Sequence, residues 1–183
     1  MSAVNQAAAP LPAAAGSEPE RLQYLTFMLG GGVFAVGILR IKEIIEYGEL
    51  TVVPRMPEFI RGVINLRGAV VPVVDLAVRF GGEATAVTRR TCVVIIEVDD
   101  EGDSSQQVIG VMVDAVNEVI EIPADQVEPA PTFGASIRAD FIQGMGKVDG
   151  RFIIVLDVTR VLSLDEMASL VNLAAPEAAM AAA

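Results

Sequence analysis

The sequence predicts an all-β protein built from two SH3-like, five-stranded β-barrels that are related by internal duplication, with a short C-terminal helix. Three observations predict this fold. Short apolar runs rich in β-branched residues alternate with glycine-containing turns along most of the chain. The middle of the chain repeats itself in order. Hydrophobic residues make up 52% of the 183 residues, which is enough to form a core in one domain or in two very small ones.

The repeat has a constant offset, interrupted by one insertion. Residues 36–54 align with 111–129 at an offset of 75, and residues 59–75 align with 141–157 at an offset of 82. The twelve identical pairs are Val36/Val111, Glu43/Glu118, Ile45/Ile120, Glu46/Glu121, Val52/Val127, Pro54/Pro129, Phe59/Phe141, Ile60/Ile142, Gly62/Gly144, Gly68/Gly150, Val73/Val155 and Asp75/Asp157. We therefore predict two barrel-forming copies, at about 21–82 and 88–162, arranged with pseudo-twofold symmetry within one domain over 21–163.

The N-terminal residues 1–20 are rich in Ala and Pro, and the first basic residue is Arg21. A secretion signal would need early positive charge and a longer apolar run, so we expect a disordered tail and a cytoplasmic protein. Residues 22–39 carry no charge, and their length is at the lower bound for a membrane-spanning helix. However, the glycines at 30–32 divide this segment into two short β-rich runs, which predicts a hairpin and no direct membrane insertion.

The strands follow in order along the two copies. In the first copy we expect strands at 23–29, 33–39, 41–47 with 51–53, 62–66 and 69–76. In the second copy we expect them at 91–98, 108–113, 117–122, 144–148 and 151–158. Arg67-Gly68 and Asp149-Gly150 are predicted to form matching hairpin turns, because glycine tolerates a positive φ. Each copy is marginal alone, so we expect a shared hydrophobic interface between the barrels.

The pattern changes at the C-terminal end of the second copy. Ser163 and Glu166 form a capping box, which predicts a short helix at about 164–173. Pro176 follows this helix, and the rest of the segment 164–183 is an Ala-rich tail.

Composition excludes several classes of function. The net charge of −11 argues against a nucleic-acid-binding protein, because phosphate binding needs basic groups at the contact face. The sequence contains no His, which removes His-based catalytic triads and His-ligated zinc. Its single cysteine, Cys92, is predicted to be a small buried hydrophobic residue within a strand. We therefore expect a protein that is not an enzyme and has no cofactor.

The remaining candidates for chemistry have structural explanations. Asp75 and Asp157 end apolar strands, where an aspartate usually caps a turn, and duplication explains why there are two. Residues 144–150 resemble a nucleotide loop but do not open a helix. The acidic loop 99–105 resembles a calcium loop but lacks the required Gly and bidentate Glu. No metal site is predicted.

Surface recognition is the function that remains. Arg67 is predicted to lie at a hairpin tip, where the second copy carries Asp149, so the repeat does not require an arginine there. An exposed pair between Glu43 and Arg67 would add only about 0–1 kcal/mol to stability. Such a pair would therefore serve orientation or partner choice.

These residues resemble the CheW-like domain family of chemotaxis coupling proteins. The resemblance covers about residues 22–167 and is carried by segments 41–45, 54–76, 110–119, 127–131, 141–144 and 154–157, with NLRGxxxP at 65–72 as the most specific block. The same fold forms the regulatory domain of the chemotaxis histidine kinase and part of the CheV adaptor. No kinase or receiver domain is attached to this chain, which favours the stand-alone coupler.

The resemblance implies a scaffold that connects the cytoplasmic tip of a methyl-accepting chemoreceptor to the kinase regulatory domain, within membrane-associated receptor arrays. The receptor's helical hairpin would lie in an apolar groove between the barrels. Carried over by position, the residues expected to bind receptor or kinase are Glu43 and Arg67 as a polar pair, Asn65, Leu66 and Gly68 as the signature turn, and Ile41 and Val111 as groove walls.

Three alternatives remain open at this stage. The first is a coupler of a related, non-flagellar chemosensory pathway. The second is an enzyme with an active site in the groove, which the missing His argues against. The third is a binder of Pro-rich peptides, which needs exposed aromatic side chains; this chain has no Trp and two Tyr.

Overall fold

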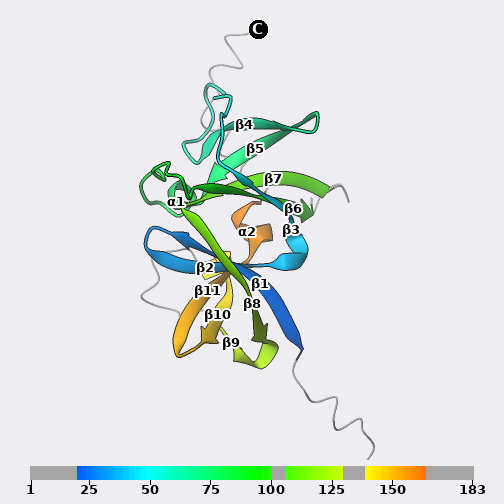
Figure 1. Cartoon of the computed structure of the whole chain (residues 1–183), viewed down its shortest axis with the longest axis vertical. Helices are drawn as coiled ribbons and strands as arrows, with labels where there is room; N and C mark the ends of the chain where they lie inside the picture. Colours follow the sequence, from blue (N-terminus) through cyan, green and yellow to red (C-terminus); the bar gives the residue numbers. More distant parts are fainter. Residues whose placement is uncertain (1–19, 100–105, 130–138, 164–183) are drawn as a thin grey trace, which may run out of the picture.

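The computed structural model describes residues 20–99, 106–129 and 139–163, and its strands form two sheets that are stacked along the long axis of the molecule (Figure 1). The six-stranded sheet has the order β8-β1-β2-β11-β10-β9, and the five-stranded sheet has the order β3-β6-β7-β5-β4. The strands are β1 (Arg21–Leu29), β2 (Gly32–Gly37), β3 (Ile41–Glu46), β4 (Ile60–Leu66), β5 (Ala69–Asp75), β6 (Cys92–Asp99), β7 (Gln106–Val113), β8 (Ala115–Pro123), β9 (Val127–Glu128), β10 (Ile142–Val148) and β11 (Arg151–Leu156). The predicted all-β fold class is confirmed.

Short helical turns join the strands. They are η2 (Ile38–Arg40), α1 (Leu76–Arg79), η3 (Ala124–Gln126), η4 (Ala139–Phe141) and α2 (Val158–Val161). The expected strand at 33–39 ends at Gly37, because η2 begins there. The uncharged segment 22–39 contains the antiparallel hairpin β1–β2, as predicted. No helix in the described part of the chain is long and apolar enough to cross a membrane. The expected helix at 164–173, most of the N-terminal tail 1–20 and most of the acidic loop 99–105 lie outside the described residues.

The two sheets exchange strands between the copies. β1 and β2 of the first copy pair with β8 and β11 of the second, whereas β6 and β7 of the second copy lie between β3 and β5 of the first. The prediction that each copy forms its own barrel is therefore wrong. The exchange uses two kinds of contact, and each occurs twice: the antiparallel pairs β1–β8 and β3–β6, and the parallel pairs β2–β11 and β5–β7. Neither barrel is complete without both copies.

The internal duplication is visible strand by strand. Replacing β8, β1, β2, β11 and β10 by their counterparts β3, β6, β7, β5 and β4 converts one sheet order into the other. The registers also agree, because Val155 lies opposite Ala35 in one sheet and Val73 lies opposite Gly110 in the other. The counterpart of β9 is the isolated bridge between Thr51 and Val63. The predicted pseudo-twofold arrangement is thus confirmed in the sheet topology.

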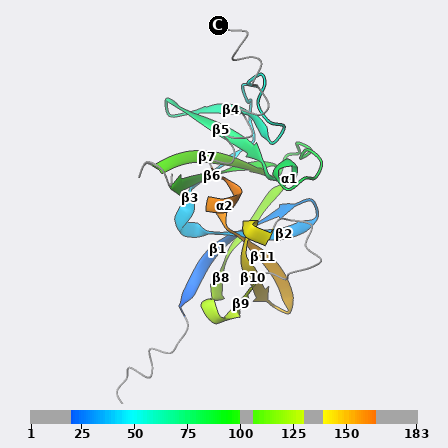
Figure 2. The ribbon, with the colours of Figure 1, turned by 180° about the vertical axis from the view of Figure 1, so that it is seen from behind.

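The largest apolar core lies between the sheets and includes Phe27, Phe34 and Phe141. Each sheet also has a small apolar cluster of its own, around Tyr24 and Ile122 in one case and around Val71 and Ile95 in the other. Seen from behind, α2 lies between the two sheets (Figure 2). The expected hydrophobic interface is therefore the main core of the protein. We call the two halves the six-stranded barrel and the five-stranded barrel.

An arginine also contributes to this central region. The guanidinium of Arg79 lies 5.2 Å from the ring centre of Phe59 and 4.7 Å from that of Phe141, which are equivalent residues of the two copies. Its Nε donates a hydrogen bond to the Val161 carbonyl at 3.0 Å. A cation between two ring faces stabilises the contact between the two copies.

Candidate partner-binding site

The predicted pair of Glu43 and Arg67 is formed. Arg67 Nη2 donates to Glu43 Oε2 at 2.7 Å. Glu43 lies in β3, and Arg67 lies at the tip of the β4–β5 hairpin. Because β3 and β4 are the two outer strands of the five-stranded sheet, this pair bridges the two edges of the sheet. The structure therefore brings together two residues that lie far apart in strand order.

The predicted signature turn holds Arg67 out into solvent. Arg67 has φ 53° and Gly68 has φ 88°, which describes a two-residue turn with both central residues in the left-handed region. Asn65 Oδ1 accepts a hydrogen bond from the Gly68 N–H at 2.9 Å. Leu66 packs against the interior cluster of the five-stranded barrel. Asn65, Leu66 and Gly68 thus position the turn, and the Arg67 side chain remains 80% exposed.

Glu43 is less exposed than its partner and is only partly satisfied. Its side chain is 24% exposed, and Oε2 accepts from Arg67, while Oε1 is buried and has no hydrogen-bond partner among the described residues. A buried carboxylate oxygen without a donor is costly in free energy.

Exposed apolar side chains lie on the same elements as this pair. Ile44, next to Glu43 in β3, is 43% exposed. Val70, in β5 just after the turn, is 71% exposed, and Leu39, in η2 just before β3, is 95% exposed. The consecutive apolar pairs at 44–45 and 70–71 predict strands covered on both faces, and that prediction is wrong, because Ile44 and Val70 face solvent. Ile44 and Val70 align with Val119 and Phe152 of the second copy, which are also exposed. The internal repeat is therefore the sequence signal that relates these four positions.

The two predicted groove walls differ from each other. Ile41 is half-buried at the start of β3, where it pairs with Ile96 and packs against the central core. Val111 is only 2% exposed. It lies in β7, the middle strand of its sheet, and packs in the core between the two barrels. The prediction that Val111 walls an open groove is therefore wrong, because the other barrel covers that side of the strand.

The aspartates that end β5 and β11 are caps, as predicted. Asp75 Oδ1 accepts from the Ala77 N–H at 3.1 Å, and Asp157 Oδ1 accepts from the Arg160 N–H at 3.3 Å. Each carboxylate thus serves the short helix of its own copy, and the two do not form an acid–base pair. Cys92 lies in β6 as predicted, although it is half-buried rather than fully buried. Within the described ranges, no group of three or more Cys, Asp or Glu residues could hold a metal ion.

A cleft lies between the barrels, where the resemblance implies an apolar groove. It has a volume of about 980 Å³. One side is formed by the β1–β2 hairpin, including Met28 and Phe34, and the other side by the segment from Phe80 to Arg90. The sequence did not predict which residues line this cleft, because its two sides are brought together only by the stacking of the barrels.

Comparison with known proteins identifies the family. The model of the CheW-like domain matches residues 23–166. The chain belongs to this family. Chemotaxis protein CheW of Klebsiella aerogenes is 34% identical over 152 residues, which cover 83% of this chain and 88% of that protein. Protein FrzA of Myxococcus xanthus is 33% identical over 139 residues, covering 75% and 81% respectively.

A solved structure agrees with this assignment. The scaffolding protein TtCheW from Thermoanaerobacter tengcongensis superposes with a TM-score of 0.69 at 32% identity, covering 79% of this chain and 90% of that one. Sequence and structure together therefore place this chain among the CheW scaffold proteins of chemotaxis.

Proposed function

We propose that this chain is a non-enzymatic adaptor that connects the cytoplasmic tip of a methyl-accepting chemoreceptor to the regulatory domain of the chemotaxis histidine kinase. It would work in the cytoplasm, recruited to membrane-associated receptor arrays, and would be needed for array assembly and for receptor control of the kinase. The observation that carries this proposal is the exposed Arg67, which Glu43 holds at the edge of the five-stranded barrel.

The fold does not explain why this position is an arginine. The equivalent turn of the six-stranded barrel has the same backbone, with φ 50° at Asp149 and φ 77° at Gly150. That turn carries the opposite charge, so the hairpin forms with either sign. An exposed ion pair contributes little to stability, which leaves recognition as the role of Arg67.

The surroundings of the pair suit a protein partner. Ile44 and Val70 offer apolar contact area, and the exposed Arg67 guanidinium can donate hydrogen bonds to a partner's acceptor. Ile41 at the start of β3 is proposed as a wall of the receptor-binding groove. Asn65, Leu66 and Gly68 would act indirectly, by holding the turn that presents Arg67.

The test is the charge reversal Arg67→Asp, measured by pull-down and calorimetry with the kinase regulatory domain and a receptor tip, separately and together. We expect at least a tenfold loss of affinity for one or both partners, because a guanidinium that would face an acidic group is replaced by a like charge. The thermal midpoint should change by no more than a few degrees, since turn-tip charges add about 0–1 kcal/mol.

The matched control is Asp149→Arg, at the equivalent turn of the other barrel. It should keep wild-type affinity for the partner that Arg67→Asp loses. Wild-type binding by Arg67→Asp would overturn the proposal, as would an unfolded Arg67→Asp protein, which would make Arg67 structural.

A coupler of a related, non-flagellar chemosensory pathway is the second candidate. The similarity to protein FrzA of Myxococcus xanthus favours it. Both candidates share the adaptor mechanism and differ in their partners. Identifying the receptor and the kinase that copurify with the tagged chain from its own cell separates them.

A further inference from the structure

The segment that joins the two copies, residues 80–91 between α1 and β6, contains only turns and irregular backbone. We call it the linker. Much of it forms one side of the cleft between the barrels, facing the β1–β2 hairpin. In Figure 1 it lies beside α1, next to that hairpin. A segment with so little backbone pairing needs side chains to hold it in place.

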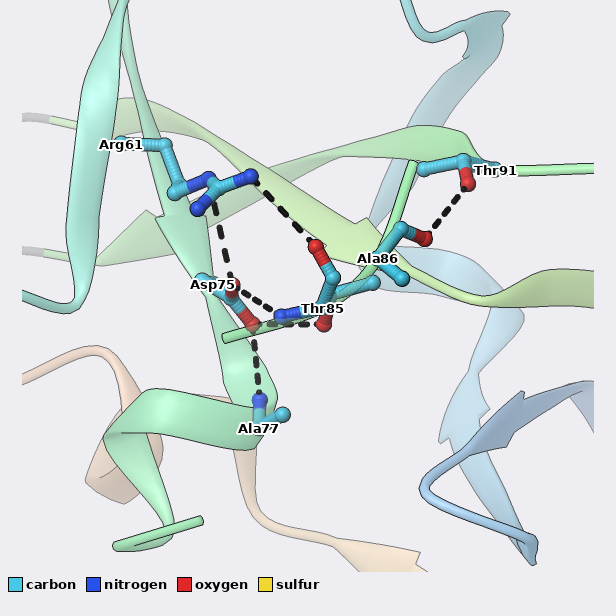
Figure 3. Close-up of polar contacts among 6 residues, drawn as sticks. All are labelled: Arg61, Asp75, Ala77, Thr85, Ala86 and Thr91. Atoms are coloured by element: carbon cyan, nitrogen blue, oxygen red, sulfur yellow. Dashed lines mark hydrogen bonds and ion pairs between the residues drawn. The ribbon is translucent and has the colours of Figure 1, made fainter. Parts of the chain in front are cut away.

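One buried carboxylate anchors the middle of the linker (Figure 3). Asp75 is fully buried. Its Oδ2 accepts from the Thr85 N–H at 2.9 Å, and its Oδ1 accepts from the Thr85 hydroxyl at 2.8 Å as well as from the Ala77 N–H. A buried carboxylate needs several donors to offset its desolvation, and two of the three hydrogen bonds come from the linker.

Arg61 in β4 completes the arrangement. Its Nε lies 3.9 Å from Asp75 Oδ2, and its Nη2 donates to the Thr85 carbonyl at 3.4 Å. One cation therefore contacts both the carboxylate and the linker backbone. The end of the linker is held at Thr91, which is 2% exposed and whose carbonyl accepts from the Tyr47 N–H at 3.1 Å. Within the linker, the Thr91 hydroxyl accepts from the Thr88 N–H at 2.8 Å and donates to the Ala86 carbonyl at 3.4 Å.

The duplication supplies an internal control for Asp75. Its equivalent, Asp157, also caps a short helix, through the Arg160 N–H. Asp157 is not fully buried, and the contacts described for its carboxylate are to that helix alone. Helix capping therefore does not account for the burial of Asp75 or for its bonds to Thr85.

We propose that Asp75, Thr85 and Arg61 form a latch that holds the linker against the base of the β4–β5 hairpin, and so keeps one wall of the inter-barrel cleft fixed. The latch is a conformational device of the free protein and is independent of the adaptor function proposed above. Movement of the linker towards or away from the β1–β2 hairpin requires these three residues to separate.

The experiment is hydrogen–deuterium exchange with mass spectrometry on the full chain, comparing the wild type with Asp75→Asn, Thr85→Val and the control Asp157→Asn. In Asp75→Asn the side-chain NH₂ cannot accept a hydrogen bond, so the N–H of Thr85 or that of Ala77 loses its acceptor, and the negative charge beside Arg61 is removed. We expect exchange of amides in 83–88 to rise at least tenfold in Asp75→Asn and several-fold in Thr85→Val. Exchange in β6 and β7 should stay unchanged, and Asp157→Asn should match the wild type in the linker.

Thr85→Val keeps both the carboxylate and the helix cap, so it decides the question even if Asp75→Asn does not fold. The latch is refuted if linker exchange in Thr85→Val equals that of the wild type. It is also refuted if exchange rises equally in the linker and in the strands, because Asp75 and Thr85 would then stabilise the whole barrel rather than the linker.

Discussion

The two barrels share one topology but differ in the charge that each presents at its β-hairpin tip. The five-stranded barrel carries Arg67, paired with Glu43, whereas the six-stranded barrel carries Asp149 at the equivalent turn and Glu118 at the position equivalent to Glu43. Both turns have the same left-handed backbone. The second turn residue is glycine in both copies, whereas the first carries opposite charges in the two turns. In the adaptor proposed above, the end that carries Arg67 would be the one that binds a partner.

A second difference concerns the aspartates that follow β5 and β11. Both cap a short helix, but only Asp75 is fully buried, because the linker between the copies folds back onto it. Asp75 and Asp157 thus share the role of helix cap, and Asp75 in addition binds the linker through Thr85. Comparing these equivalent residues distinguishes the helix cap, which both copies need, from the burial of Asp75, which comes from its surroundings.

The largest expected effect is on stability and concerns a pair of equivalent glycines, one from each copy. Gly62 and Gly144 are equivalent and lie where the pairing register shifts in each hairpin. A Cβ on Gly62 would lie 2.6 Å from the Thr51 carbonyl oxygen, and one on Gly144 would lie 2.8 Å from that of Glu128. We expect Gly62→Ala and Gly144→Ala each to lower the free energy of unfolding by about 2–3 kcal/mol, because backbone atoms must move. Urea denaturation measures this change.

Gly68→Ala is the control for that comparison. It has the left-handed φ of 88° but open space around the new Cβ, so it should cost only about 1 kcal/mol. If Gly62→Ala and Gly68→Ala cost the same, close packing at the register shift is not what requires glycine there.

A charge swap tests whether the Glu43–Arg67 pair acts through its geometry or its polarity. The double variant E43R/R67E restores an ion pair, so its free energy of unfolding should stay within about 1 kcal/mol of the wild type. It reverses the charge presented to a partner, so partner binding should stay as weak as in R67D. Calorimetric titration alongside urea denaturation measures both quantities. Recovery of wild-type affinity in the swapped protein would show that the pair only positions the turn.

The smallest expected effect concerns Arg40, whose equivalent in the other copy is Ala115. Arg40 Nη1 donates to Asp99 Oδ2 at 2.6 Å, and this hydrogen bond, together with the guanidinium charge, holds the pKa of Asp99 below its ordinary value. Because the folded-state pKa is the lower one, the pair stabilises the fold above the unfolded-state pKa. That contribution is lost as the pH falls through the folded-state pKa.

Arg40→Gln should therefore raise the pKa of Asp99 towards its ordinary value, which carboxyl-carbon NMR measures during an acid titration. Arg21→Gln, which removes the exposed contact to Glu121, is the control and should leave the Asp99 titration where it is. An Asp99 titration that is identical in Arg40→Gln and the wild type would contradict the pairing.

Local features of the fold were predicted well from the sequence. Alternating apolar residues and glycine turns located most strands, and the two Arg67-Gly68 and Asp149-Gly150 turns formed as expected, because such turns depend on nearby residues. Of the predicted site, the Glu43–Arg67 pair and the Asn65 turn are formed. Val111 was predicted to line a groove but is buried in the core. The identity of an apolar residue in a strand does not show whether it faces a groove or the core.

The sequence by itself determined that the chain is a duplicated β scaffold. The hairpin turns depend on neighbouring residues, and the repeat can be read by aligning the sequence with itself. Only the tertiary structure decided which strands pair, which residues the cleft brings together and why Asp75 is buried. The physical reason lies in the duplication itself. Two nearly equivalent copies bury the same apolar faces whether or not they exchange strands, so hydrophobic pattern cannot distinguish the two arrangements, and only long-range pairing and packing do.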